Sequence, residues 1–207
     1  MKTLRTLLLL AAALPAVAQA QRSTPVFGTK GLFLGAALNG SAIKLDEFSD
    51  DNDDETDSGG GLALFGGWGF TPQLALYVEA SAASIDSDGE TWTLAHADLG
   101  LRYHFTGATR KFVPFVQGAI TGRLGSFDDI DFEDEDGVDV ELSGGGFTLG
   151  GGFLYFFNKS LALSTDLKWT TGEFDKVKVG NVSVDGLDID ATTSRFGLGL
   201  TWFPGRK

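Results

Sequence analysis

The chain has 207 residues, and its 28 acidic against 16 basic residues give a formal net charge of −12. This balance argues against a basic surface that binds nucleic acid or anionic lipid, because attraction to phosphate requires clusters of Lys and Arg. The sequence contains no cysteine, so an exported form would gain no stability from disulfides.

The first 20 residues have the layout of a cleaved signal peptide. A basic start is followed by an apolar stretch over 7–17 and a small-residue cleavage site at 18–20. The apolar stretch is shorter than the roughly 20 residues that a membrane-spanning helix needs. We therefore expect export of the chain, removal of residues 1–20 and a periplasmic segment at 21–30.

Beyond this segment, apolar residues recur at every second position in a series of short segments. Over 74–82, for example, one face is wholly apolar, whereas Tyr77, Glu79 and Ser81 occupy the other. A period of two places such sets on opposite sides of a strand. We predict eight strands, at 31–43, 61–70, 74–84, 91–105, 112–124, 142–157, 160–172 and 191–203.

Short and long connections alternate between these strands. The short turns are 71–73, 106–111 and 158–159, and the long connections are 44–60, 85–90, 125–141 and 173–190. This asymmetry is typical of a membrane barrel with short periplasmic turns and long extracellular loops. The sequence predicts an all-β, eight-stranded antiparallel up-and-down transmembrane β-barrel over 31–203, followed by a tail at 204–207.

The last long connection contains its own alternating segment. Apolar and polar residues alternate over 176–184, on both sides of Gly180 and Asn181. Such a pattern predicts a β-hairpin that projects beyond the membrane. If this hairpin joined the wall, the barrel would have ten strands, and the sequence leaves that alternative open.

Two further residue types support a narrow membrane barrel. Glycines on the inward face leave room inside a small cylinder: Gly144, Gly146, Gly150, Gly152, Gly197 and Gly199. Outward aromatic residues gather at the short-turn end, as expected at a membrane interface: Trp68, Phe70, Tyr103, Phe105, Phe112, Phe153, Tyr155, Phe157 and Trp202. We expect lipid outside this wall and a polar lumen inside it.

Polar side chains of both signs are predicted on the inward face: Glu79, Asp98, Arg102, Gln117, Arg123, Asp166, Lys168 and Arg195. Buried charges persist only when they are paired, so mixed signs predict a salt-bridge network that plugs the lumen. Eight strands leave an interior that side chains can fill, which argues against a wide channel. A narrow pore and a catalytic pair of carboxylates are the alternative interpretations.

The acidic connections are candidates for weak divalent binding. Carboxylate clusters can hold Ca²⁺ or Mg²⁺, but Glu55 stands where the EF-hand pattern requires glycine. A solvated acidic loop is therefore the default interpretation. The weak divalent candidates are Asp50, Asn52, Asp54, Asp134 and Asp136. No pattern in the sequence predicts a cofactor.

The last strand carries a polar residue, then glycine two positions on, then apolar residues five and seven positions on: Arg195, Gly197, Leu200 and Trp202. With the signal peptide and the eight alternating strands, this pattern resembles the small outer-membrane β-barrel proteins of the OmpA-like and OmpX-like porin superfamily. The continuation through 204–207 departs from the family, which usually stops at an aromatic residue. The resemblance implies insertion by the barrel-assembly machinery and residence in a Gram-negative-type outer membrane.

The resemblance also bears on function and partners. It implies a non-enzymatic role in membrane integrity or surface interaction, with outer-membrane lipid and lipopolysaccharide as surroundings and divalent cations possible at the loops. A narrow porin or small-solute transporter is the alternative. A lipid A-modifying enzyme is a second alternative, for which His96 with Ser84 is the one candidate pair. His96 and His104 lie eight residues apart, roughly 26 Å along a strand, and cannot share one metal.

Overall fold

The computed structural model of the protein describes residues 28–45, 57–87, 90–105, 111–132, 135–179 and 182–204. The predicted signal peptide lies outside these residues, and its cleavage stays a prediction. No helix within the described part of the chain is long and apolar enough to cross a membrane.

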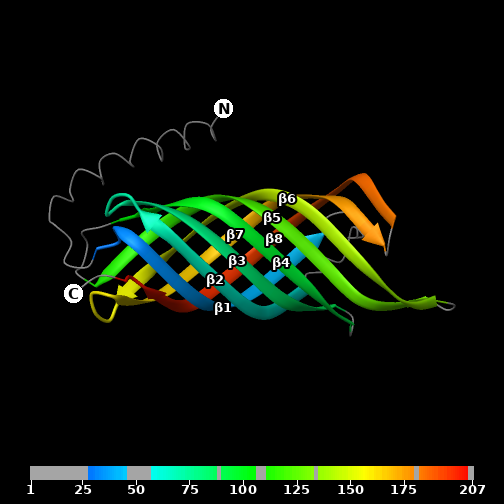
Figure 1. Ribbon diagram of the computed structural model, residues 1–207, viewed down its shortest axis with the longest axis horizontal. Helices are drawn as coiled ribbons and strands as arrows, with labels where there is room; N and C mark the ends of the chain where they lie inside the picture. Colours follow the sequence, from blue (N-terminus) through cyan, green and yellow to red (C-terminus); the bar gives the residue numbers. More distant parts are fainter. Residues whose placement is uncertain are drawn as a thin grey trace, which may run out of the picture.

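The described residues form a closed barrel of eight antiparallel strands, each paired with its neighbours in chain order (Figure 1). The first strand pairs with the second and also with the last, so the sheet closes on itself. The strands are β1 (Gly31–Leu45), β2 (Asp57–Gly69), β3 (Leu74–Ser87), β4 (Glu90–His104), β5 (Phe112–Phe132), β6 (Glu135–Phe156), β7 (Leu161–Val179) and β8 (Val182–Trp202). The predicted fold class is confirmed, and the barrel has eight strands rather than ten.

Alternation along each strand separates the inside of the barrel from the outside. In β3, Tyr77 and Glu79 are buried inside, whereas Leu76 and Val78 are 40% and 54% exposed on the outer surface. The period of two therefore places apolar side chains on the outer surface, where they can face hydrocarbon, and the remaining side chains on the inner surface.

Polar side chains organise the short turns. The hydroxyl of Thr71 accepts a hydrogen bond from the backbone N–H of Leu74 at 2.9 Å. The side-chain oxygen of Asn158 accepts one from the backbone N–H of Leu161, also at 2.9 Å. Such side-chain acceptors replace the backbone partners that a tight turn lacks, which is why Thr and Asn occupy these positions.

Three of the predicted long loops are wrong, because the strands continue through most of them. Of residues 85–90, residues 85–87 belong to β3 and residue 90 to β4. Residues 125–141 belong largely to β5 and β6, and residues 173–190 to β7 and β8, which pair with one another there. The predicted hairpin over 176–184 is confirmed by the pairing of Val177 with Val184, and it continues β7 and β8. These extended strand pairs reach furthest at the right of Figure 1.

The expectation of a polar lumen is only partly correct, since the interior is polar at mid-depth and apolar at both ends. The cluster toward the short turns contains large side chains such as Phe33, Phe115 and Phe156. The cluster toward the long strand pairs contains Trp92 and Phe174 among others. Eight strands enclose so narrow a space that inward side chains can meet and bury apolar surface.

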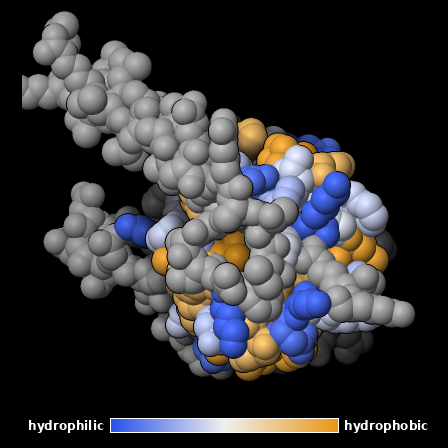
Figure 2. Space-filling view, turned by 90° about the vertical axis from the view of Figure 1, so that its left-hand side faces the viewer, coloured by the Kyte–Doolittle hydropathy of each residue, from blue (hydrophilic) through white to orange (hydrophobic). Residues whose placement is uncertain are grey.

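The outward aromatic residues expected at the short-turn end lie on the outer surface there. Trp68, Phe157 and Trp202 are each more than half exposed, and Tyr103 packs edge-on against Phe105 with ring centroids 5.2 Å apart. Figure 2 shows hydrophilic and hydrophobic side chains side by side at this end. Amphipathic rings in such a mixed zone suit the boundary between hydrocarbon and water.

Candidate functional site

The mid-depth layer of the interior holds most of the charged side chains singled out in the sequence. All eight predicted lumen residues are buried, between 2% and 7% exposed: Glu79, Asp98, Arg102, Gln117, Arg123, Asp166, Lys168 and Arg195. The structure brings five of them into one network and places the other three toward the two ends of the barrel. Each group has a different set of partners.

Arg195 on β8 is the centre of the network. Its Nη2 donates to Asp98 Oδ2 at 3.0 Å, and to the hydroxyls of Thr148 at 3.1 Å and Thr170 at 3.0 Å. The hydroxyl of Thr121 donates to Asp98 Oδ1 at 2.8 Å. One guanidinium therefore joins strands from opposite sides of the barrel through charge-assisted bonds.

Lys168 on β7 forms the second half of the network. Its Nζ contacts Glu79 in a salt bridge and lies 3.4 Å from Asp166 Oδ1. Glu79 also lies 4.0 Å from Nη1 of Arg195, which links the two halves. Two cations thus face three carboxylates, and pairing of this kind offsets the several kcal/mol that each ion loses on leaving water.

Arg102 on β4 lies toward the short turns, in an aromatic cage. Its Nε donates to Gln117 Oε1 at 2.9 Å. Four ring centroids lie between 4.3 and 5.9 Å from its guanidinium carbon: Phe33, Phe65, Tyr77 and Phe115. Rings attract a cation through their negative faces, so this cage stabilises a charge inside an apolar cluster.

Arg123 on β5 lies at the other end of the polar layer. Its Nη1 donates to the carbonyl of Ala191 at 2.9 Å and its Nη2 to that of Gly145 at 3.3 Å, and the guanidinium lies 4.8 Å from the Phe174 ring centroid. Backbone carbonyls and a ring, rather than carboxylates, are therefore its partners.

The sequence analysis missed the hydroxyls that complete the network. Thr121, Thr148 and Thr170 form a chain of hydrogen bonds, with oxygens 2.6 Å apart between the first two and 2.7 Å between the last two. These threonines follow the same inward period as the charged residues. Their alternation was the available signal, but a neutral hydroxyl, unlike a buried charge, does not require a partner of opposite sign.

The structure does not bring together His96 and Ser84, the candidate pair for the lipid A-modifying alternative. His96 is buried inside β4, whereas Ser84 lies on the outer surface of β3. His104 is also inside, further along β4 and near Phe115. A histidine and a serine on opposite faces of the wall cannot exchange a proton, so this pair offers no nucleophile with its base.

The predicted divalent candidates are not placed by the structure. Asp50, Asn52, Asp54 and Asp134 lie outside the described residues, and for Asp136 only the backbone, within β6, is described. Among the side chains that are described, no group of three or more metal-ligating residues is close enough to hold an ion. Divalent binding at these loops stays a prediction.

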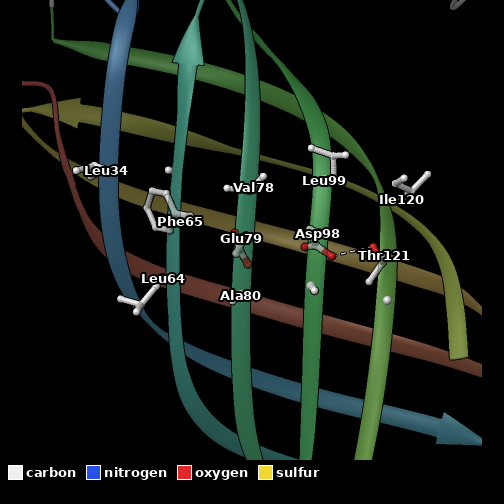
Figure 3. A pocket seen from close by; sticks show the side chains of 13 residues that line it. Leu34, Leu64, Phe65, Val78, Glu79, Ala80, Asp98, Leu99, Ile120 and Thr121 are labelled. Atoms are coloured by element: carbon white, nitrogen blue, oxygen red, sulfur yellow. Dashed lines mark hydrogen bonds between the residues drawn. The ribbon is translucent and has the colours of Figure 1, made fainter. Parts of the chain in front are cut away.

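A groove of about 680 Å³ lies on the outer surface of β1–β5 at mid-depth (Figure 3). Outward side chains 44% to 66% exposed flank it: Leu34, Leu64, Val78, Leu99 and Ile120. Small residues such as Ala80, Ala97 and Gly122 lower its floor, and Asp98 beneath it bonds Thr121 inside the barrel. The groove is thus a feature of the lipid-facing wall.

The four residues of the predicted assembly pattern lie on both sides of β8. Arg195 and Gly197 face the interior, whereas Leu200 and Trp202 are 48% and 51% exposed outside. Recognition of this strand by the assembly machinery stays a prediction. The geometry shows only that the polar half of the pattern serves the interior and the apolar half the lipid side.

Among known proteins, one family model matches most of the chain. The model of the outer membrane protein beta-barrel domain matches residues 6–201. No curated protein matches the chain in sequence.

Three solved structures share the fold at low identity. Neisserial surface protein A is 12% identical with a TM-score of 0.62, covering 84% of this chain and 97% of its own. OprG of Pseudomonas aeruginosa is 15% identical with a TM-score of 0.53, covering 86% and 98%. Ail, the attachment invasion locus protein of Yersinia pestis, is 10% identical with a TM-score of 0.51, covering 84% and 100%.

Proposed function

Because the chain belongs to the outer membrane protein beta-barrel domain family, we propose that it is a non-enzymatic barrel that holds an exposed sheet outside the cell for surface interaction. The observation that carries this proposal is the length of its last four strands. β5 to β8 contain 19 to 22 residues each. A transmembrane strand needs about 9–11. Roughly half of each strand therefore extends past the membrane.

This extension, which we call the outer sheet, comprises residues 126–132 and 135–143 of β5 and β6 and residues 173–179 and 182–190 of β7 and β8. One of its faces is charged: Lys176 lies 3.6 Å from Asp185, and Lys178 lies 3.5 Å from Glu141. Exposed pairs of this kind contribute little stability, about 0–1 kcal/mol each. They keep that face soluble.

The other face of the outer sheet is apolar. Val177 pairs in register with Leu142 on one side and Val184 on the other, and Leu142 packs on the interior cluster around Phe174. Val179 and Val184 are 41% and 52% exposed. Apolar side chains that share one exposed face of a sheet can form a contact surface, which supports a role in surface contact.

Two features support this proposal over its rivals. The apolar clusters at both ends of the interior, with a charged plug between them, argue against a narrow porin or small-solute transporter. The separation of His96 from Ser84 across the wall argues against a lipid A-modifying enzyme. Removal of residues 1–20, insertion by the assembly machinery, and contacts with lipopolysaccharide are further parts of the proposal.

The outer sheet is tested with cells that express the barrel, using beads coated with octyl chains as the probe and uncoated beads as the blank. We expect cells with the double variant Val179→Ser and Val184→Ser to bind coated beads several-fold less than cells with the parent chain. The matched control, Lys176→Ser with Lys178→Ser, changes the charged face and should retain binding. Equal binding by all three would refute the proposal.

A second measurement separates surface interaction from membrane integrity. Cells without the protein are compared with cells that express the valine variant, by uptake of a hydrophobic fluorescent dye. A role in membrane integrity predicts that the membrane leaks without the protein and that the valine variant restores the barrier fully. It also predicts that the variant leaves bead binding unchanged. Dye exclusion without the protein, combined with lost bead binding in the variant, supports surface interaction.

A further inference from the structure

Three residues lie side by side on the inner surface where the barrel closes. Asn39 on β1 pairs in register with Gly197 on β8, and Gly197 pairs with Asp166 on β7. Neighbouring positions in such a row are about 4.5–5.5 Å apart. Because the middle residue has no side chain, the Asp166 carboxylate lies over Gly197, on the same inner face as Asn39.

Three residues that line one small cavity beside Gly197 carry polar atoms without a hydrogen-bond partner. Asn39 Oδ1, Asp166 Oδ1 and Arg195 Nε have no hydrogen-bond partner among the described residues. Asn39, Asp166 and Arg195 are only 8%, 7% and 2% exposed. A buried polar atom without a partner destabilises the folded state, so three residues with such atoms around one cavity point to a common partner.

The cavity has the size of one water molecule. It measures about 10 Å³ and is lined by Asn39, Asp166, Arg195 and Gly197, together with neighbours from β2 and β3. On this measure one water needs about 10–15 Å³ and two to four polar partners. We infer that one buried water binds here, donating to Asn39 Oδ1 and Asp166 Oδ1 and accepting from Arg195 Nε.

The surrounding charges favour water over an ion. Lys168 Nζ lies 3.4 Å from Asp166 Oδ1, so a cation at the same oxygen would face a like charge at short range. An anion would face Asp166 and Glu79, which also lines the cavity. Water is neutral and supplies both donors and acceptors, which matches two unpartnered acceptors and one unpartnered donor.

The inference gives Gly197 a structural role distinct from recognition of the last strand. A Cβ added at Gly197 would lie 2.9 Å from Asp166 Oδ1, the flexible end of a side chain. Gly197→Ala would therefore occupy the cavity and move the carboxylate while the backbone stays in place. The water would bridge the first strand to the seventh across the eighth, at the seam that closes the barrel.

The test is NMR of the isotope-labelled full chain, refolded in lipid nanodiscs. We expect cross-peaks between the water frequency and both Gly197 Hα and the Asn39 side-chain amide, with opposite signs in NOE and ROE spectra, as a long-lived water gives. In Asn39→Leu the cross-peak at Gly197 should be lost. In Gly197→Ala the cross-peak at the Asn39 amide should be lost.

Thr201→Val is the matched control, because Thr201 is also inward, buried and without a partner for its hydroxyl among the described residues, yet does not line the cavity. It should retain both cross-peaks. Absence of the cross-peaks from the parent chain would overturn the inference, and this needs no variant to fold. Persistence of the cross-peaks in both cavity variants would also overturn the inference. Chemical-shift changes at Asn39 and Gly197 that saturate with added Na⁺ or K⁺ would overturn it as well, because they would indicate a bound cation.

Discussion

Arg195 is the residue on which the buried charges most depend, since it contacts Asp98, Thr148 and Thr170 at once. We expect Arg195→Met to lower the free energy of unfolding by about 3–5 kcal/mol, because it leaves the Asp98 carboxylate buried without its cation. Urea unfolding in lipid vesicles, followed by tryptophan fluorescence, measures the change.

The double variant Arg195→Met with Asp98→Asn is the control for this prediction. The double variant also removes the Asp98 charge, which the single variant leaves buried without a cation. It should therefore recover a substantial part of the lost stability. If the single variant unfolds at the same urea concentration as the parent chain, the salt bridge contributes nothing and the network is not what holds the interior together.

At the level of single residues, the sequence allowed the inside or outside position of each side chain to be predicted, but not its partner. The period of two placed Asp98 and Arg195 on the inward face correctly, because alternation is a local property of a strand. Their contact depends on how far neighbouring strands are staggered around the cylinder. That stagger is set by pairing along the whole sheet, and no single segment encodes it.

Among the elements, β6 and β7 show why glycine recurs along the inner wall. A Cβ at Gly152 would lie 1.9 Å from the backbone oxygen of Thr165 on β7, whereas a Cβ at Gly122 on β5 would meet nothing within 4 Å. Gly122 lies on the outer surface, whereas Gly152 is one of the inward glycines, which were predicted to leave room for long side chains. The close approach of the neighbouring backbone is the more direct cause at Gly152.

We therefore expect Gly152→Ala to destabilise the barrel by about 1–3 kcal/mol or to prevent refolding, since backbone cannot move aside cheaply. The matched variant Gly122→Ala should change stability by less than about 0.5 kcal/mol. The fraction that migrates as the folded form on an unboiled gel, and the urea midpoint, measure both. Equal effects of the two substitutions would contradict the steric explanation.

The extent of β5 to β8 was the least predictable property of the elements. Residues 128–141 are rich in Asp and Glu, which are depleted in strands, so propensity favours a loop there. Pairing with a neighbouring strand overrides that preference, as at Ile130 with Val138. The hairpin over 176–184 was predicted correctly, because valines at alternate positions carry a local signal.

For the whole molecule, the three layers of the interior predict that the barrel does not conduct ions. Apolar clusters that include aromatic side chains lie toward both ends, and the cavity beside Gly197 in the polar layer between them measures about 10 Å³. Planar bilayers containing the refolded protein should show no discrete current steps.

Arg195→Ala should also remain non-conducting, because the apolar clusters around Phe33 and Phe174 stay in place. Discrete current steps from both the parent chain and Arg195→Ala would support the porin alternative. Steps that appear only in Arg195→Ala would mean that the charged plug, rather than the apolar layers, blocks the passage.

The pairing of β1 with β8 brings together opposite ends of the polypeptide, from Leu34 beside Trp202 to Leu45 beside Ala191. Contacts so distant in the chain carry a large loop-closure cost and slow the folding reaction. A product truncated before residue 182 has no final strand, which leaves β1 and β7 with unsatisfied edges that invite aggregation. Synthesis must therefore reach residue 202 before the barrel can close, and the chain has to be kept from premature association until then.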